Sequence, residues 1–466
     1  MTFLKRNKKW ILIIAAFILV RVIIFSSFWA ASADKGGWNN FYSLAQPASS
    51  VMMRLFHDFC DWHPPFYYTF TSIILLIFSS QWFIYITQIM LALLAVWLSY
   101  KIARLFFNEK IAVTSAFLVG IEPYFAWHNF LLVSENLFTP LLLAGIYYLF
   151  IFVKNNARRD FYFSALFFGL ATLVRPNTLV LAPVLSVFLL IIFLLKKPIG
   201  QEKILSFSAK NFLAVLVVFN LIFFAILSPW MIRNKIVYGE FTLANVLSEN
   251  MFFYNLPPLI SMQKNISYEN AYRQIVDEAK KHLKEPIDSQ GNCKLYSKEE
   301  FSARQDYYSK ASKNYILSSL KDYVKMHLVK TVPFFFQSGY FEMWSAYSGE
   351  YSKPDITALV LKKDLSGVKK FFKEVNAKLV FYILGAALWG IASVAAFFAV
   401  IYSYFKDRER FFFFLISLAI ILLNALLISP FVLARYRLPI NILFFIPLVY
   451  AASKIARFKF KSKIKE

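Results

Sequence analysis

Cysteine, glycine and acidic residues are all scarce in this 466-residue chain. Its two cysteines, Cys60 and Cys293, are too few for a disulfide framework or a cysteine-rich metal site. Among only 13 glycines, the pair Gly36-Gly37 lacks the surrounding pattern of either phosphate-binding glycine loop, so no nucleotide site is indicated. The 27 acidic residues face 51 basic ones. In a soluble protein this excess would suggest nucleic acid, but in a hydrophobic chain it first raises the question of membrane topology.

Hydrophobic residues make up 59% of the chain, above the roughly 45–50% of a soluble domain. They gather in blocks near the ~20 residues that cross a bilayer as a helix. The sequence therefore predicts an all-α polytopic membrane protein of about ten transmembrane helices. The predicted spans are 10–31, 82–100, 111–130, 137–153, 161–174, 178–195, 211–230, 378–405, 411–429 and 440–453.

The positions of the basic residues predict the orientation of these spans. With a cytoplasmic N-terminus, the segments predicted to lie inside hold 23 Lys and Arg against 6 Asp and Glu. Cytoplasmic loops collect positive charge, so we expect both termini in the cytoplasm. The block at 10–31 is too long for a cleavable signal peptide and is interpreted as a retained helix.

Three segments depart from simple spans. Residues 66–80 are apolar but short, which predicts an interfacial or re-entrant helix. The run 161–195 is broken at Pro176, which predicts two short helices with Arg175 at their outer junction. Residues 233–377 form one long polar stretch with helical spacing, which predicts a helical extracytoplasmic cap.

The sequence thus divides into three regions. We expect an N-terminal transmembrane module at 1–232 with a first outer loop at 32–65, an extracytoplasmic domain at 233–377, and C-terminal helices with a basic cytoplasmic tail at 378–466.

A few charged residues remain outside the inner segments and the cap, and most are predicted at or near the outer face. Ionisable groups at membrane depth are costly, so they are usually paired or functional. Arginines suit a phosphate and carboxylates suit a general base. The sequence therefore predicts an outer-leaflet pocket for a lipid phosphate. The remaining residues are Asp34, Asp58, Asp61, Glu122, Glu135, Arg21, Lys35, Arg54, Arg175, Lys378, Arg435 and Arg437.

Five motifs in the same order resemble GT-C glycosyltransferases, in particular the protein-mannosyltransferase-like and aminoarabinose-transferase-like branch. They are Asp61-Trp-His63-Pro64-Pro65-Phe-Tyr67, Glu122-Pro123 with Ser134-Glu135, Gly169-Leu-Ala-Thr-Leu-Val-Arg175-Pro176, Pro229-Trp230-Met-Ile-Arg233-Asn234 and Arg435-Tyr436-Arg437-Leu-Pro439. The resemblance implies transfer of a sugar from a polyprenyl-phosphate donor to a glycan, lipid or protein acceptor on the outer face, with inversion and without a nucleotide sugar.

The first loop departs from the family pattern. The family usually has an acidic residue shortly before an early Tyr, whereas Trp38 and Asn39 stand here before Tyr42. Asparagine cannot act as a base. We expect Asp34 to take the catalytic role with Asp61 as the second carboxylate, while Asp58 remains an alternative.

The other site residues follow from the same argument. Arg175, Arg435 and Arg437 are expected to bind the donor phosphate, with interfacial anchoring as the alternative for the last two. Substrate contacts are expected from His63, Glu135, Asp58 and Arg233, although Glu135 alternatively caps the fourth span. The sequence identifies no definite cofactor, and a divalent cation bound near His57, Asp61 and His63 is an alternative.

Two other functions fit parts of the pattern. A lipid-linked sugar transporter or flippase would need charged residues in the inner halves of several helices, and only Arg21 is a candidate there. A non-catalytic accessory protein of GT-C type would explain Asn39. No nucleic acid partner is expected.

Overall fold

The computed structural model describes residues 2–33, 64–195, 205–244, 246–283, 298–348, 366 and 377–463. Within these ranges the chain is helical and contains no strand, which confirms the predicted all-α class. The membrane-associated helices are α1 (Thr2–Ala33), α3 (Phe66–Phe78), α4 (Trp82–Phe106), α5 (Glu109–Ile121), α6 (Pro123–His128), α7 (Glu135–Asn155), α8 (Arg158–Thr172), α9 (Leu181–Leu195), α10 (Ala209–Tyr238), α19 (Ala377–Lys406), α20 (Arg408–Ile428) and α21 (Asn441–Lys463).

Eight of the described helical segments are long and apolar enough to cross a membrane, so the chain is a multi-pass membrane protein. They lie in α1, α4, α7, α9, α10, α19, α20 and α21. Two other predicted spans do not appear among these eight segments. The span at 111–130 is divided into α5 and α6, and the span at 161–174 corresponds to the 15-residue α8.

The break between α5 and α6 has a local cause. Pro123 has no backbone N–H, and the Glu122 carboxylate accepts hydrogen bonds from the backbone amides of Tyr124 (3.2 Å) and Phe125 (2.6 Å). A capping acid followed by proline at the first helical position starts a new helix. Glu122 is therefore a helix cap here.

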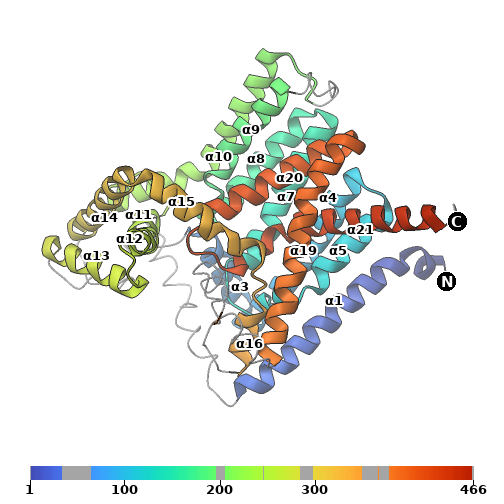
Figure 1. Ribbon diagram of the computed structural model, residues 1–466, viewed down its shortest axis with the longest axis horizontal. Coiled ribbons are helices and arrows are strands. Elements are labelled where there is room, and N and C mark those ends of the chain that lie inside the picture. The colour runs from blue at the N-terminus through green and yellow to red at the C-terminus, as the bar shows by residue number, and fades with distance from the viewer. Residues whose placement is uncertain are drawn as a thin grey trace.

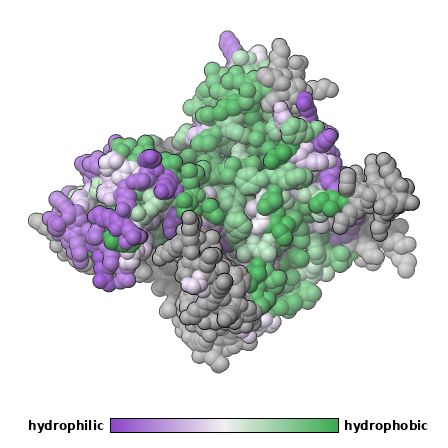
Figure 2. All heavy atoms as spheres, in the orientation of Figure 1, coloured by the Kyte–Doolittle hydropathy of each residue, from purple (hydrophilic) through white to green (hydrophobic). Residues whose placement is uncertain are grey.

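The membrane helices pack in a continuous bundle (Figure 1). Helix α7 packs against α4 and α8, α8 against α10, and α21 against both α19 and α5. Aromatic rings fill the contacts: the Phe161 ring stacks on Phe152 with centroids 4.4 Å apart and on Phe219 at 4.1 Å. Many large apolar side chains face outward, and Figure 2 shows a broad hydrophobic surface over the bundle. Such a surface suits contact with lipid.

The described residues of the predicted 233–377 region fold mostly as helices. They are α11 (Val246–Glu249), the π-helix η3 (Asn250–Asn255), α12 (Leu256–Lys264), α13 (Tyr268–His282), α14 (Lys298–Ser318), α15 (Leu320–Thr331), the 3-10 turn η5 (Val332–Phe335) and α16 (Tyr340–Ser348). Helices α11–α15 have their own core, which includes Phe253, Leu259 and Met326. Their outer surface is mainly hydrophilic in Figure 2. Helix α10 itself continues through Arg233 to Tyr238, and α19 begins at Ala377.

Candidate active site

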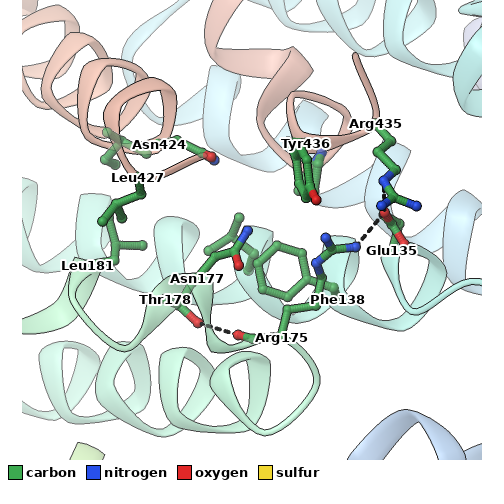
Figure 3. Close-up of a pocket in the computed structure, with 13 residues that line it drawn as sticks. Glu135, Phe138, Arg175, Asn177, Thr178, Leu181, Asn424, Leu427, Arg435 and Tyr436 are labelled. Atoms are coloured by element: carbon green, nitrogen blue, oxygen red, sulfur yellow. Dashed lines mark hydrogen bonds and ion pairs between the residues drawn. The ribbon is translucent and has the colours of Figure 1, made fainter. Parts of the chain in front are cut away.

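One partly open pocket lies where the ends of several membrane helices meet, and its empty space of about 430 Å³ includes the solvent at its mouth. Its walls come from α7, α9 and α20, from the 3-10 turn η2 (Pro176–Thr178), and from the turns η6 (Ala434–Tyr436) and η7 (Leu438–Ile440) (Figure 3). The lining residues are Glu135, Phe138, Leu142, Arg175, Asn177, Thr178, Leu181, Ile420, Asn424, Leu427, Arg435, Tyr436 and Pro439.

Two arginines converge on one carboxylate in this pocket. Arg175 Nη1 forms a short ion pair with Glu135 Oε1, and Arg435 Nε lies 3.7 Å from the same oxygen. The Glu135 side chain is only 4% exposed, whereas that of Arg435 is 40% exposed. Two guanidinium cations and one carboxylate leave a net charge of plus one in a pocket with largely apolar walls. This charge can attract a small anion.

The local sequence explains how these side chains reach the pocket. Glu135 follows Ser134 at the first residue of α7, where an acid favours the positive end of a helix. Arg175 precedes Pro176 and is extended (φ −144°, ψ 127°), as expected for a residue before proline. The chain therefore leaves α8 with Arg175 directed toward α7. Arg435 lies on the short turn η6 between α20 and α21.

An aromatic ring supports both arginines. The Tyr436 ring centroid lies 5.1 Å from Arg175 Cζ and 5.2 Å from Arg435 Cζ. Cations are attracted to the faces of aromatic rings at such distances. Figure 3 shows Tyr436 beside this pair of guanidinium groups. Tyr436 therefore helps to hold the two cations close together despite their like charge.

Arg437, the third predicted phosphate ligand, does not line this pocket. It is buried, with its guanidinium carbon 3.7 Å from the centroid of the Trp389 ring. Its nitrogens donate short hydrogen bonds to the backbone carbonyls of Phe334 and Gln337. Arg437 thus ties the turn before α21 to α19, to η5 and to the segment between η5 and α16.

Arg233 also lies away from the pocket lining. On α10, its Nη1 donates to Asn234 Oδ1 (3.0 Å), and its guanidinium lies over the Trp230 ring at 4.6 Å. Asp34, Asp58, Asp61 and His63 fall outside the described residues, as do His57, Cys60 and Cys293. The described chain resumes at Pro64, and Phe66 N donates to Leu173 O (3.1 Å). The end of the first loop is therefore anchored two residues before Arg175.

Arg21 has a structural environment. Its Nε donates to Asn129 Oδ1 (3.0 Å) and its Nη1 to Gly120 O (2.8 Å), while the guanidinium lies 3.3 Å from the Phe17 centroid. Asn129 in turn donates to Asn136 Oδ1, one residue after Glu135 (3.0 Å). Arg21 therefore joins α1 to the same end of the bundle that carries the pocket, not to the opposite end.

Only Glu135, Arg175 and Arg435 of the 13 lining residues were predicted as site residues; the unexpected ones include Phe138, Asn177, Asn424 and Tyr436. Asn424 gave a recognisable signal because it is an amide inside a predicted span, and Tyr436 lies within the Arg435-Tyr436-Arg437 motif. Across the residues that the structure describes, no group of three His, Cys, Asp or Glu side chains could hold a metal ion.

Comparison with known proteins agrees with the predicted resemblance. Residues 62–230 match the family model described as dolichyl-phosphate-mannose-protein mannosyltransferase. This match confirms the resemblance to GT-C glycosyltransferases. Glu135 and Arg175 both fall within the matched segment. No curated protein gives a significant match to the chain.

Two similar solved structures are forms of the Archaeoglobus fulgidus oligosaccharyltransferase. One is the archaeal oligosaccharyltransferase AglB in complex with an inhibitory peptide and a dolichol-phosphate, with 14% identity, a TM-score of 0.48 and 98% of this chain covered. The other is the apo form, with 14% identity, a TM-score of 0.47 and 97% covered. The chain spans 52% of the length of each.

Proposed function

We propose that this protein is a membrane glycosyltransferase of GT-C type, which moves a sugar from a polyprenyl-phosphate donor to an acceptor. The observation that carries the proposal is the convergence of Arg175 and Arg435 in a pocket with apolar walls. The match of residues 62–230 to a family of lipid-phosphate-sugar transferases supports the same chemistry. The donor phosphate would bind both guanidinium groups, because their planar donor sets fit phosphate oxygens.

Glu135 has two roles in this proposal. Its carboxylate holds Arg175 and Arg435 together before the donor arrives, and it reduces the net charge of the site to plus one. A donor whose phosphodiester carries one negative charge then makes the loaded site neutral. After transfer the leaving polyprenyl phosphate gains negative charge, and the two arginines stabilise that charge.

The base is proposed to come from the first outer loop. Asp34 or Asp61 would take the proton from an acceptor hydroxyl while the acceptor oxygen attacks the anomeric carbon. The new glycosidic bond forms as the bond from that carbon to the phosphate oxygen breaks on the opposite face, so the configuration inverts. The anchoring of Phe66 N on Leu173 O supports this placement, because it brings the end of the first loop close to Arg175.

The proposed orientation follows from the distribution of basic residues. Both termini would lie in the cytoplasm, with the pocket and α11–α16 on the outer face. His63, Asp58 and Arg233 remain proposed substrate contacts at the rim. The environment of Arg437 favours a positioning role over a phosphate contact, since its donors already bond two backbone carbonyls.

The test is binding and turnover of labelled polyprenyl-phosphate sugars by the purified protein. We expect a bound donor and released lipid phosphate, with about 100-fold weaker binding for Arg175→Gln or Arg435→Gln, the effect of losing a charged contact of ~2.7 kcal/mol. The matched control is Arg159→Gln, because that exposed side chain lies on α8 outside the pocket. Wild-type protein that binds none of the donors would contradict the proposal.

The two other functions predict different results in the same preparation. A flippase would move a labelled lipid-linked sugar across a proteoliposome membrane without releasing lipid phosphate. A non-catalytic protein would bind donor without turnover, and Asp34→Asn and Asp61→Asn would then leave its behaviour unchanged. The pocket-end location of Arg21 disfavours the flippase, since Arg21 was its candidate for an inner-half charge.

A further inference from the structure

Helix α3 directly follows the first outer loop, and its first two residues connect it to other helices. The backbone N–H of Phe66 donates to Leu173 O (3.1 Å), two residues before Arg175. The hydroxyl of Tyr67 donates to Gln88 Oε1 (2.9 Å) on α4. The first bond joins two backbone groups and needs no particular side chain. The second bond needs a tyrosine, so it is the connection that the sequence specifies.

Gln88 extends this connection to the turn between α6 and α7. Its Nε2 donates to Leu131 O (3.1 Å), a carbonyl of that turn. The side chain of Asn136, on the first turn of α7, donates to the same Leu131 oxygen (3.1 Å). Asn136 directly follows Glu135, the carboxylate of the pocket. A continuous chain of hydrogen bonds therefore joins the Tyr67 hydroxyl to the residue beside Glu135.

The side chains of this chain are buried, so water does not compete for their hydrogen bonds. Tyr67, Gln88 and Asn136 are 6%, 0% and 5% exposed. Besides its bond from Tyr67, the Gln88 side chain donates to Asn129 O (3.0 Å) in the same turn. Loss of the Tyr67 hydroxyl would remove the donor that orients the Gln88 oxygen. A buried polar group that loses its partner is costly, so the amide would reorient and its bonds to the turn would weaken.

The two connections of α3 reach the two partners of one ion pair. The bond from Phe66 ends on the segment that leads into Arg175, and the chain from Tyr67 ends beside Glu135. Adjacent residues at the end of the first outer loop are thus bound to both segments that supply this pair. Asp61, a proposed base, lies six residues before Tyr67 in the sequence. A shift of the first turn of α3 would therefore move the end of the loop relative to the phosphate site without altering any pocket residue.

We propose that Tyr67 is a positioning residue for the transfer reaction. Its hydroxyl acts through Gln88 and the turn between α6 and α7, and it holds the end of the first outer loop in a fixed position relative to the Arg175–Glu135 pair. Tyr67 itself does not line the pocket. This inference rests on the proposed function. It gives a role to the tyrosine that ends the Asp61–Tyr67 motif, which the proposed function leaves without one.

The first test separates the rate of transfer from donor binding. Tyr67→Phe removes only the hydroxyl and is expected to lower kcat about tenfold, the effect of one lost buried hydrogen bond. The Kd of the donor should stay the same, because both arginines remain. The matched control is Tyr100→Phe, which removes a 2.9 Å hydrogen bond to Glu109 near the other end of α4 and should keep the wild-type kcat. A Tyr67 variant with a lower melting temperature but an unchanged kcat would overturn the proposal.

A double-variant cycle tests whether Tyr67 acts through Gln88. Gln88→Met removes the amide and is expected to lower kcat at least as much as Tyr67→Phe. The double variant should be no slower than Gln88→Met alone, because both changes break the same chain of hydrogen bonds. Losses that multiply would show that the hydroxyl acts by another route and would overturn the proposal. If Gln88→Met does not fold, the milder Tyr67→Phe still decides through kcat.

Hydrogen exchange distinguishes failure of this inference from failure of the proposed function. In Tyr67→Phe, the peptides 66–72 and 129–137 should both exchange faster, whereas Tyr100→Phe should leave them unchanged. If the wild type transfers no sugar while both peptides respond, the proposed function is overturned together with the role in transfer, and the hydrogen-bond connection is supported. If the wild type transfers sugar and the Tyr67 variant changes neither kcat nor exchange, the positioning role is overturned and the proposed function stands.

Discussion

At the scale of single residues, Arg435 and Arg437 show how two neighbours in one motif acquire different roles. Successive residues on a 3-10 turn are rotated by roughly 120°, so side chains two positions apart point in well-separated directions. Arg435 reaches Glu135 in the pocket, whereas Arg437 enters a site formed by Trp389 and two carbonyl groups. Both arginines look alike in the sequence, and only the position of the turn between α20 and α21 separates them.

The cluster around Glu135 gives a first prediction. Glu135→Gln should destabilise the protein by about 3 kcal/mol, because it removes the countercharge of the largely enclosed Arg175 guanidinium and of the partly exposed Arg435. Thermal unfolding in detergent measures the effect. Added polyprenyl phosphate should then raise the melting temperature of the variant more than that of the wild type, since the phosphate replaces the missing negative charge.

The control for this variant is Glu269→Gln. Glu269 pairs with Arg273 on the surface of α13, where both side chains are about 70% exposed. Exposed pairs contribute about 0–1 kcal/mol, so little change is expected. Equal losses of stability in the two variants would contradict the assigned role of Glu135.

At the scale of elements, the close contact between α7 and α8 depends on a glycine, Gly145, which has no side chain. A Cβ on Gly145 would lie 2.6 Å from Phe168 Cδ1, whereas a Cβ on Gly120 would meet its nearest atom at 3.5 Å. Gly145→Ala should therefore cost about 1–3 kcal/mol through overpacking. Gly120→Ala should be neutral or stabilising because alanine favours a helix. Chemical denaturation measures the free energy of unfolding of both variants. Equal changes in this free energy for Gly145→Ala and Gly120→Ala would contradict the prediction.

The stability of the α11–α15 region is expected to depend on pH, because the region contains a buried glutamate, Glu249. Burial raises the pKa of the Glu249 carboxyl to about 8, against the lowering effects of the Gln305 hydrogen bond and the Arg304 charge. The folded state then holds a proton that the unfolded state, with its usual pKa of 4.5, releases. The contribution of Glu249 to stability is therefore greatest below pH 4.5 and decreases as the pH rises toward 8.

Glu249→Gln should remove this decrease, so that the variant is more stable than the wild type above pH 8. Hydrogen exchange in peptides of α11–α14, followed from pH 5 to pH 9, measures it. The surface variant Glu269→Gln should retain the wild-type pH dependence. A wild-type profile in the Glu249 variant would show that another group titrates.

The sequence predicted elements better than contacts. Long apolar blocks predicted most of the spans, because hydropathy is a property of a short stretch of sequence. Pro176 marked the end of a helix, and the residue before it, Arg175, has an extended backbone. The division at Glu122-Pro123 was missed because the apolar composition continues across it. The meeting of Glu135, Arg175 and Arg435 was expected in outline. The partners of Arg437 and the place of Asn424 in the pocket lining were not expected, since both depend on how helices far apart in the sequence pack.

At the scale of the whole molecule, the orientation in the membrane remains a prediction with a direct test. In a background without Cys60 and Cys293, we expect Lys280→Cys on α13 to react with a membrane-impermeant thiol reagent in intact cells. Lys406→Cys, at the end of α19, should react only after permeabilisation. Both lysines are exposed, so accessibility of the side chain is matched. The reverse pattern would place the pocket on the cytoplasmic side.

The bonds of Arg437 have a consequence for biogenesis. The carbonyl groups of Phe334 and Gln337 leave the ribosome about a hundred residues before the arginine that binds them. Until the last membrane helix is inserted, this part of the nascent chain lacks its permanent donor. Quality-control proteases would therefore meet an incomplete junction in any product truncated before Arg437, even though every upstream helix is already present.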